Sequence, residues 1–476
     1  MLFNSLNFFL FIVFIFIAYP RLHLRGQNIF LLVMSYLFYG YWDWRFTFLL
    51  FILTLIDFWI GQKIQTSESQ RSRKLLLFLS VAVNLSILGF FKYYNFFIES
   101  AASVLSAVGF NPHIPVLRVI LPIGISFYIF KTLTYTSDIY RRRITASEDF
   151  INYALFLSFF PQLLAGPIDR ASALLPQIAS PRLITREKVL TGLNLVLLGF
   201  FKKVAIADSL APIVGKIFDA SDAMSGGQLW TGVYAYTFQI YGDFSGYTDI
   251  ARGISRILGF ESVENFNAPY LSKNITEFWQ RWHISLSTWF RDYLYIPLGG
   301  NRQGNVRTYA NLVITMLLCG LWHGAAWTFI LWGLLHGIYL MGHRMIMSGR
   351  QISYSWPRSF SGRATRVVQV ILTFHLVALA WVLFRASSLE SALGYYAGLL
   401  FRFDRLSDIS APVLLAGSLM IALDIAQIKC ANHSWLMDRR YLRVLRYGVA
   451  QLLFLSVLCA AVAHLGTVTP FIYFQF

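Results

Sequence analysis

Apolar runs separated by short polar and basic stretches follow one another along the whole chain. A membrane-spanning helix needs about 20 mostly apolar residues. The pattern therefore predicts an all-α, polytopic membrane protein with roughly 11–13 membrane segments, some of them short enough to be re-entrant. The candidate segments lie at 3–19, 27–41, 45–61, 75–97, 117–137, 150–165, 189–206, 227–242, 309–322, 325–342, 366–385, 411–428 and 447–466.

The longest uncharged stretch covers residues 308–343, in which no Asp, Glu, Lys or Arg occurs. A straight helix of this length would measure about 54 Å, whereas the hydrocarbon core of a bilayer is only about 30 Å thick. The stretch must therefore bend, and Gly320 and Gly324 bracket the obvious place. Non-helical backbone at membrane depth is tolerated only against protein or a water-filled cavity. We therefore expect His323, between the two glycines, at a helix break that faces an interior tunnel.

Residues 272–300 show a separate helical periodicity, with one apolar and one polar face. This pattern predicts an amphipathic helix that lies in the membrane interface or lines a polar cavity, with His283 at the edge of the polar face. Asn274 and Glu277 have capping-box spacing and should begin the helix, and Pro297 with Gly299–Gly300 should end it. The apolar face carries Ile275, Phe278, Trp279, Trp282, Leu286, Trp289, Phe290 and Tyr293, and the polar face carries Gln280, Arg281, Ser287, Thr288, Arg291 and Asp292.

The composition supports an integral membrane protein. Hydrophobic residues make up 57% of the 476 positions and charged residues 13%, whereas soluble domains average roughly 45–50% and about 25%. We expect a single membrane domain, residues 1–476, with a motif-rich core at about 120–345. Cys319, Cys430 and Cys459 are scattered and form neither a disulfide framework nor a metal-binding pattern, so neither a bound metal nor a bound cofactor is expected.

The net charge of +17 would suggest nucleic-acid binding in a soluble protein. Here the basic residues cluster between apolar runs, which the positive-inside rule explains better. Arg21 and Arg25 follow the first run, and further basic clusters follow the third and fifth. These loops should be cytoplasmic, which places the N-terminus outside. We expect contact with membrane lipids and no nucleic-acid partner.

Each polar candidate also has a purely structural explanation. His323 could bond to a backbone carbonyl near the glycine break, and His283 could simply lie in the interface. Taken together they favour chemistry, because a histidine can take the proton of a hydroxyl group near neutral pH. Asp243, at an expected glycine-flanked break, could bind backbone amides or line a tunnel mouth. Lys131 could snorkel or pair with an interior acid.

The remaining candidates concern substrate binding. Arg281 and Arg291 could hold a phosphate-bearing donor or contact lipid headgroups. Trp322 and Ser287 are candidates for lining the same site. His336 is expected to pack or to meet the headgroup region. The sequence has no Walker loop, GxSxG elbow or HExxH motif, so nucleotide hydrolysis and serine-hydrolase chemistry have no support.

Several long motifs resemble the membrane-bound O-acyltransferase family, and specifically its bacterial alginate O-acetyltransferase-like branch. The resemblance implies many membrane helices around a central tunnel, with an acyl donor arriving from the cytoplasm and an acceptor from outside. It matches His323 to the family's WHG histidine and His283 to its RWHxS histidine, whereas Lys131 departs from an acidic position in relatives. The motifs are LPIGISFYIF at 121–130, FFPQLLAGPIDR at 159–170, YGDFSGYTDIARG at 241–253, FNAPYLSKNITEFWQRWHISLSTWFRDYLYIPLGGNR at 266–302 and GLWHGAAWTFILWGLLHG at 320–337.

The resemblance implies an acetyltransferase of the bacterial inner membrane that serves O-acetylation of an extracytoplasmic polysaccharide such as alginate or cellulose. Acetyl-CoA is the implied donor, and the acceptor is either the polysaccharide itself or a carrier on a periplasmic partner. In this interpretation His323 is the general base, and His283 orients the acceptor or stabilises developing charge. Acetylation of peptidoglycan, D-alanyl transfer to teichoic acid and acyl-group transport without chemistry remain alternatives. Transport predicts paired broken helices in two related halves, and the sequence shows no such repeat.

Overall fold

The computed structural model describes residues 1, 3–110, 117, 119–347, 360–402, 408–429, 443–463 and 471–472. These residues are largely helical, and no β-strand occurs among them, which confirms the all-α prediction. Cys430 and residues 464–466 of the last candidate segment lie outside the described residues. The chain divides into two compact units, Met1–Leu193 with Ala251–Val263 and Asn194–Ile250 with Glu264–Phe476.

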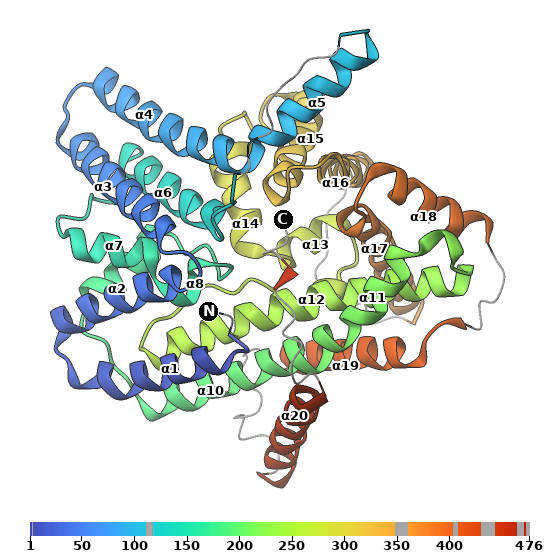
Figure 1. Cartoon of the computed structure of the whole chain (residues 1–476). Coiled ribbons are helices and arrows are strands. Elements are labelled where there is room, and N and C mark those ends of the chain that lie inside the picture. Colours follow the sequence, from blue (N-terminus) through green and yellow to red (C-terminus); the bar gives the residue numbers. More distant parts are fainter. Residues whose placement is uncertain are drawn as a thin grey trace. The chain divides into compact units, whose positions relative to one another are not determined.

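The first unit is built from helices (Figure 1). A π-helical turn, Gly89–Tyr93, joins α4 directly to α5, so the expected segment 75–97 is part of a longer helical run. The expected segment 150–165 is instead two short helices, because Phe159 leaves the helical conformation before Pro161. The helices are α1 (Leu6–Ala18), α2 (Leu24–Gly40), α3 (Arg45–Thr66), α4 (Gln70–Leu88), α5 (Tyr94–Ala107), α6 (Ile125–Tyr140), α7 (Phe150–Ser158), α8 (Phe160–Leu163) and α9 (Ala171–Ala179).

The second unit carries the two regions that break the simple helix pattern. Two helices, α10 (Arg186–Phe200) and α12 (Gly226–Ile257), run from one unit into the other, and a π-helical turn, Phe201–Asp208, follows α10. The other helices are α11 (Ser209–Asp219), α13 (Ile275–Arg281), α14 (Ile284–Phe290), α15 (Gly304–His323), α16 (Trp327–Ile346), α17 (Phe360–Arg385), α18 (Leu389–Phe401), α19 (Ala411–Lys429) and α20 (Arg443–Ala463).

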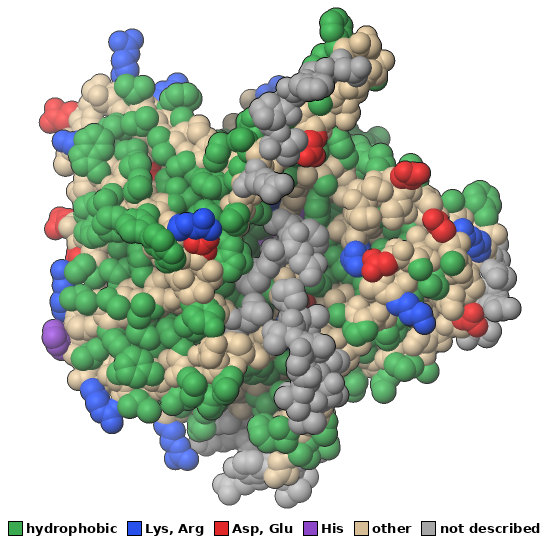
Figure 2. All heavy atoms as spheres, in the orientation of Figure 1, with side chains coloured by type: hydrophobic (Ala, Val, Ile, Leu, Met, Phe, Trp, Pro, Cys, Tyr) green, Lys and Arg blue, Asp and Glu red, His purple; other side chains and the backbone are tan. Residues whose placement is uncertain are grey.

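Five helical runs among the described residues are long and apolar enough to cross a membrane. They are Arg45–Thr66, Gln70–Ala107, Arg186–Asp219, Ser361–Arg385 and Ala411–Ile428. Large apolar side chains on α1 stand exposed, including Leu6, Phe9 and Leu10. Figure 2 shows many apolar side chains on the visible surface of α1–α4. An apolar surface of this extent is typical of contact with lipid, so the chain is a multi-pass membrane protein.

The predicted break at Asp243 is wrong, because α12 continues without interruption from Gly226 to Ile257. The flanking glycines serve close helix contact instead. A Cβ atom added to Gly246 would lie 2.7 Å from the carbonyl oxygen of Gly199, and one added to Gly242 would lie 3.0 Å from that of Lys202. Small residues at such positions let two membrane helices approach closely. The pattern of glycines therefore marks a helix contact within the second unit, not a helix end.

Candidate active site

The predicted single helix over 272–300 is wrong, because the chain breaks at His283. It forms the short helices α13 and α14, and His283 between them has φ +43° and ψ +55°, in the left-handed region. Asn265 holds this turn: its carbonyl oxygen accepts a hydrogen bond from Ile284 N at 2.9 Å. The Asn265 side chain accepts a second one from Ser285 N at 3.2 Å. His283 is fully buried at the break and does not lie at the edge of a polar face.

Both predicted ends of this region are confirmed. The Asn274 side chain accepts a hydrogen bond from Glu277 N, as an N-cap does. After α14, a π-helical turn, Arg291–Tyr295, leads to Gly299 and Gly300, which have φ of +109° and +56°. Residues with side chains seldom adopt such angles, so the two glycines let the chain turn towards α15.

The predicted break near Gly320 and Gly324 is confirmed. The first helix, α15, ends at His323, Gly324 is extended, and α16 begins at Trp327. The two helices fold back on each other and pack side by side (Figure 1). A Cβ atom added to Gly320 would lie only 2.2 Å from the carbonyl oxygen of Phe329. The glycine therefore permits the close approach that holds the turn after His323 against α16.

The two breaks bring His283 and His323 together. Their ring centroids lie 6.5 Å apart, a separation too long for a direct hydrogen bond between the two imidazoles. His283 is 0% exposed and His323 3%. Trp322 borders both histidines, with ring centroids 6.0 Å from His283 and 5.0 Å from His323, and Phe244 contacts His283 edge-on at 4.6 Å. Burial lowers the pKa of the His283 imidazole to about 3, so this ring is neutral at physiological pH.

A cavity of about 360 Å³ lies between α13–α14 and α15–α16, and its lining residues include near neighbours of the two histidines but neither histidine itself. Its walls include Ile284, which follows His283, and Cys319, one helical turn before His323. The full set of lining residues is mostly apolar, with polar groups at Thr276, Gln280, Ser287, Thr288, Arg291 and Thr315. Small-molecule sites commonly combine such an apolar wall with a few polar groups.

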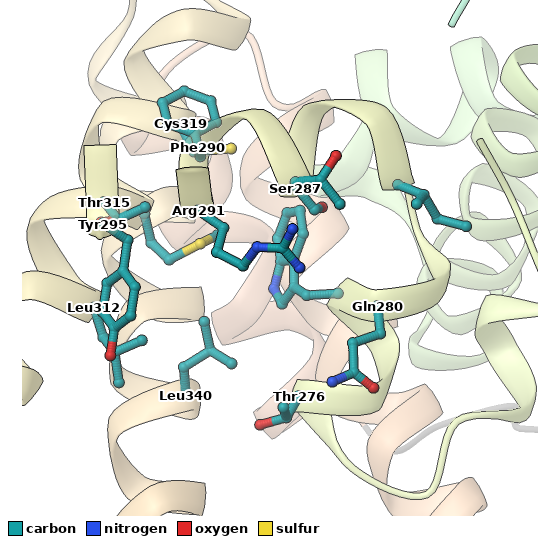
Figure 3. Close-up of a pocket in the computed structure, with 14 residues that line it drawn as sticks. Thr276, Gln280, Ser287, Phe290, Arg291, Tyr295, Leu312, Thr315, Cys319 and Leu340 are labelled. Carbon is teal, nitrogen blue, oxygen red and sulfur yellow. The ribbon is translucent and has the colours of Figure 1, made fainter. Parts of the chain in front are cut away.

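Two of the predicted substrate-binding residues, Ser287 and Arg291, line this cavity. Figure 3 shows the Arg291 side chain extending into its centre. The Arg291 Nε atom donates to Asp292 Oδ1 at 2.7 Å, and this hydrogen bond raises the pKa of the guanidinium. Arg281 is not among the lining residues; its Nη2 atom pairs with Glu277 Oε1 at 2.7 Å. Arg281 and Arg291 were both candidates for binding the donor, but only Arg291 lines the cavity.

Asp243 lies away from a helix end, in a buried cluster of charges. One oxygen pairs with Lys203 Nζ at 2.6 Å, and the other accepts a hydrogen bond from Ile472 N at 2.7 Å. Lys203 also pairs with Asp208 at 2.8 Å. Asp243 thus accepts a hydrogen bond from a backbone amide, but this amide belongs to the C-terminal part of the chain and Asp243 is not at a helix end as expected.

Lys131 does not snorkel, because it is only 2% exposed. Its Nζ atom donates to the carbonyl oxygen of Phe156 at 3.1 Å and to Gln162 Oε1 at 3.0 Å. Gln162 in turn donates to Asp169 Oδ2 at 2.5 Å. The lysine is thus coupled to an interior acid through one glutamine, which is close to the second alternative that the sequence left open.

His336 was expected to pack or to meet the headgroup region, and the structure shows that it packs. It is fully buried on α16, and its Nδ1 atom accepts a hydrogen bond from Trp279 Nε1 at 3.3 Å. Trp332 links it to the catalytic candidate: the Trp332 ring centroid lies 4.8 Å from that of His336 and 5.1 Å from that of His323. The spacing of Trp332 and His336, one turn apart on α16, was the available signal for this contact. Among the described residues, no group of His, Cys, Asp and Glu could hold a metal ion.

Comparison with known proteins gives a consistent picture. The model of the MBOAT, membrane-bound O-acyltransferase family, matches residues 31–384. The chain is 44% identical to the probable alginate O-acetylase AlgI of Azotobacter vinelandii, over 84% of this chain and 77% of the relative. It is 40% identical to the probable alginate O-acetylase AlgI of Pseudomonas putida over the full length of both. It is also 37% identical to a peptidoglycan O-acetyltransferase of Helicobacter pylori, over 84% of this chain and 80% of the relative.

Proposed function

Because the chain belongs to the membrane-bound O-acyltransferase family, we propose that it transfers acetyl groups from cytoplasmic acetyl-CoA towards an extracytoplasmic polysaccharide such as alginate. The observation that carries this proposal is the buried pair of His283 and His323 beside a mostly apolar cavity. The alginate O-acetylases among its relatives support the choice of acyl group and acceptor class.

The proposed reaction assigns different tasks to the two histidines. His323 removes the proton from the acceptor hydroxyl group while the oxygen of that hydroxyl group attacks the acetyl carbonyl carbon. The carbonyl electrons move to oxygen, then return as the carbon–sulfur bond breaks. The leaving thiolate takes the proton from His323, which restores the neutral ring. The lowered pKa of His283 makes it a weak base, so its task is to orient the acceptor as a neutral hydrogen-bonding partner.

The size of the cavity bears on the donor. A volume of about 360 Å³ suits a thioester arm and does not suit a polymer. Arg291, at its centre, is positioned to pair with an anionic group of the donor. The acceptor would then reach the histidines as a single hydroxyl group, presented by the polysaccharide or by a carrier residue on a periplasmic partner. We place this multi-pass protein in the bacterial inner membrane with the N-terminus outside, as the distribution of basic loops favours.

A second acceptor is peptidoglycan, because the Helicobacter pylori relative is named for that activity. The chemistry at His323 would be the same, and only the hydroxyl-bearing polymer would differ. D-alanyl transfer requires another donor, so the identity of the donor separates it from both acetylation reactions.

The direct test uses the purified full-length protein in lipid vesicles with labelled acetyl-CoA or with carrier-linked labelled D-alanine. Alginate oligomers and peptidoglycan fragments are supplied in parallel, each with and without the periplasmic fraction. We expect label to move from acetyl-CoA to alginate. Transfer to peptidoglycan alone would replace the acceptor, and transfer from the alanine carrier alone would contradict the proposal.

A further inference from the structure

Buried N–H groups cluster around Trp332, whose ring contacts that of His323. Trp332 and His336 lie one turn apart on α16, and both are fully buried. Trp279 Nε1 donates to His336 Nδ1 at 3.3 Å, so Nδ1 of a neutral ring is the acceptor. The ring hydrogen is then on Nε2, because a neutral imidazole carries one hydrogen. Trp279 therefore fixes His336 as a hydrogen-bond donor through Nε2.

Several of these donors have nothing to donate to. Within the described part of the chain, Trp332 Nε1, His336 Nε2 and Trp282 Nε1 are buried and find no acceptor. Buried polar groups in folded proteins are normally hydrogen-bonded, so each exception calls for an explanation. The neighbouring Trp381 shows the ordinary case, since its Nε1 atom donates to the Tyr270 hydroxyl at 3.2 Å. The described part of the protein therefore offers no hydrogen-bond acceptor to these three N–H groups.

The position of these N–H groups suggests which molecule supplies the acceptor. The Trp332 ring centroid lies 5.1 Å from that of His323 and 5.8 Å from that of Trp279. Trp279 is itself a wall of the cavity. Trp332 thus contacts both His323 and a residue that lines the cavity, and His336 contacts Trp332. An acyl group delivered from the cavity to His323 would bring a carbonyl oxygen, which is an acceptor, to this place.

We propose that Trp332 Nε1–H and His336 Nε2–H donate hydrogen bonds to the carbonyl oxygen of the acetyl group being transferred. This inference rests on the proposed function and assigns two further catalytic residues to it. When the acceptor hydroxyl oxygen bonds to the carbonyl carbon, the carbonyl electron pair moves to this oxygen, and the two N–H groups stabilise its negative charge. When the pair returns, the carbon–sulfur bond breaks and the thiolate takes the proton held by His323.

The test compares two analogues of acetyl-CoA in binding to the full-length protein. One is the ketone in which CH2 replaces the thioester sulfur, and the other is S-ethyl-CoA, in which CH2 replaces the carbonyl group. Trp332→Phe keeps an aromatic ring but removes the N–H group. It should weaken binding of the ketone about three- to tenfold, as the loss of one hydrogen bond does, and leave S-ethyl-CoA unchanged. Trp381→Phe, which loses an N–H group that Tyr270 already occupies, is the matched control and should alter neither affinity.

Equal effects of Trp332→Phe on both analogues, or an equal effect of Trp381→Phe on the ketone, would overturn the inference. If the unchanged protein binds neither analogue, acetyl-CoA is the wrong donor and the proposed function fails separately. The carbonyl assignment is then decided by acetyl transfer in membranes. There Trp332→Phe should be slower than Trp381→Phe by about 100-fold, the usual cost of losing one such donor. Equal rates would overturn it.

Discussion

His283 and His323 lie with their ring centroids 6.5 Å apart, although each stands at the end of a separate helical break. Neither break follows from the other. Asn265 fixes the first, and the close contact of Gly320 with Phe329 fixes the second. A space between two imidazoles that are too far apart to bond directly can hold a hydroxyl group that contacts both. The backbone at each break is therefore part of the site. Substitutions at the breaks can be chosen so that their effects on folding and on catalysis are measured separately.

Replacing His283 by Asn should preserve folding and abolish most of the activity. Asn tolerates the left-handed conformation that His283 adopts, whereas the β-branched Val does not. We expect His283→Asn to reach the membrane in normal amounts but to acetylate at least about 100-fold more slowly. His283→Val should also lose folded protein, as size-exclusion profiles of the solubilised variants would show. Normal turnover by the Asn variant would contradict a chemical role for His283.

The burial of His283 also predicts how stability depends on pH. The ordinary pKa of a histidine side chain, 6.5, falls to about 3 for His283 in the folded protein. Below pH 6.5 the unfolded chain therefore binds the extra proton, and stability falls as the pH decreases. Between pH 7.5 and pH 5 this histidine should cost about 2 kcal/mol. Thermal unfolding in detergent at the two pH values measures the loss, which should be smaller by that amount in His283→Asn. An identical loss in both proteins would argue against a neutral, buried His283.

Gly320 should not tolerate even one added methyl group. Gly320→Ala would place Cβ 2.2 Å from the carbonyl oxygen of Phe329, which belongs to the backbone and cannot easily move. We expect a loss of about 1–3 kcal/mol, measured as a lower midpoint of thermal unfolding. Gly342→Ala, in α16, is the control because nothing lies within 4 Å of the added atom. Equal stability of the two variants would mean that α15 and α16 are not so closely packed.

Arg291 and Arg281 should respond differently to replacement by Ala. Arg291 extends into the cavity, so Arg291→Ala should raise the apparent KM for acetyl-CoA about tenfold, the effect of losing one charge-assisted hydrogen bond. Arg281 pairs with Glu277 outside the cavity lining, so Arg281→Ala should leave KM nearly unchanged. Initial rates across a range of acetyl-CoA concentrations give both values. A larger rise in KM for Arg281→Ala would place the donor elsewhere.

The sequence predicted the features that depend on length and charge. The uncharged stretch 308–343 exceeds the bilayer thickness, and the structure breaks it beside His323 as expected. The sequence could not reveal the break at His283, because a helical wheel assumes a continuous helix. The turn is held by Asn265, which lies outside the stretch 272–300. The glycines around Asp243 led to the wrong prediction of a helix break for a similar reason. They allow the approach of another helix, which sequence periodicity does not record.

The packing of His336 was expected from the sequence, but its hydrogen bond was not, because the partner Trp279 lies far along the chain. An isolated histidine on an apolar helix suggests packing, and only the contact with Trp279 identifies which nitrogen accepts a hydrogen bond. The same applies to the unpaired indole of Trp332, which is indistinguishable in sequence from the paired indole of Trp381. Candidate bases could be predicted from residue type and depth, whereas candidate hydrogen-bond donors required the three-dimensional contacts.

The most direct measurement of the central claim is polysaccharide acetylation by His323→Ala, with the amount of protein in the membrane determined in the same cells. The control is His375→Ala, since His375 lies on α17 and bonds to Tyr234. We predict that His323→Ala is present at the normal level and loses acetylation by at least about 100-fold, whereas His375→Ala acetylates normally. Undiminished acetylation by His323→Ala would contradict the assignment of this histidine as the catalytic base.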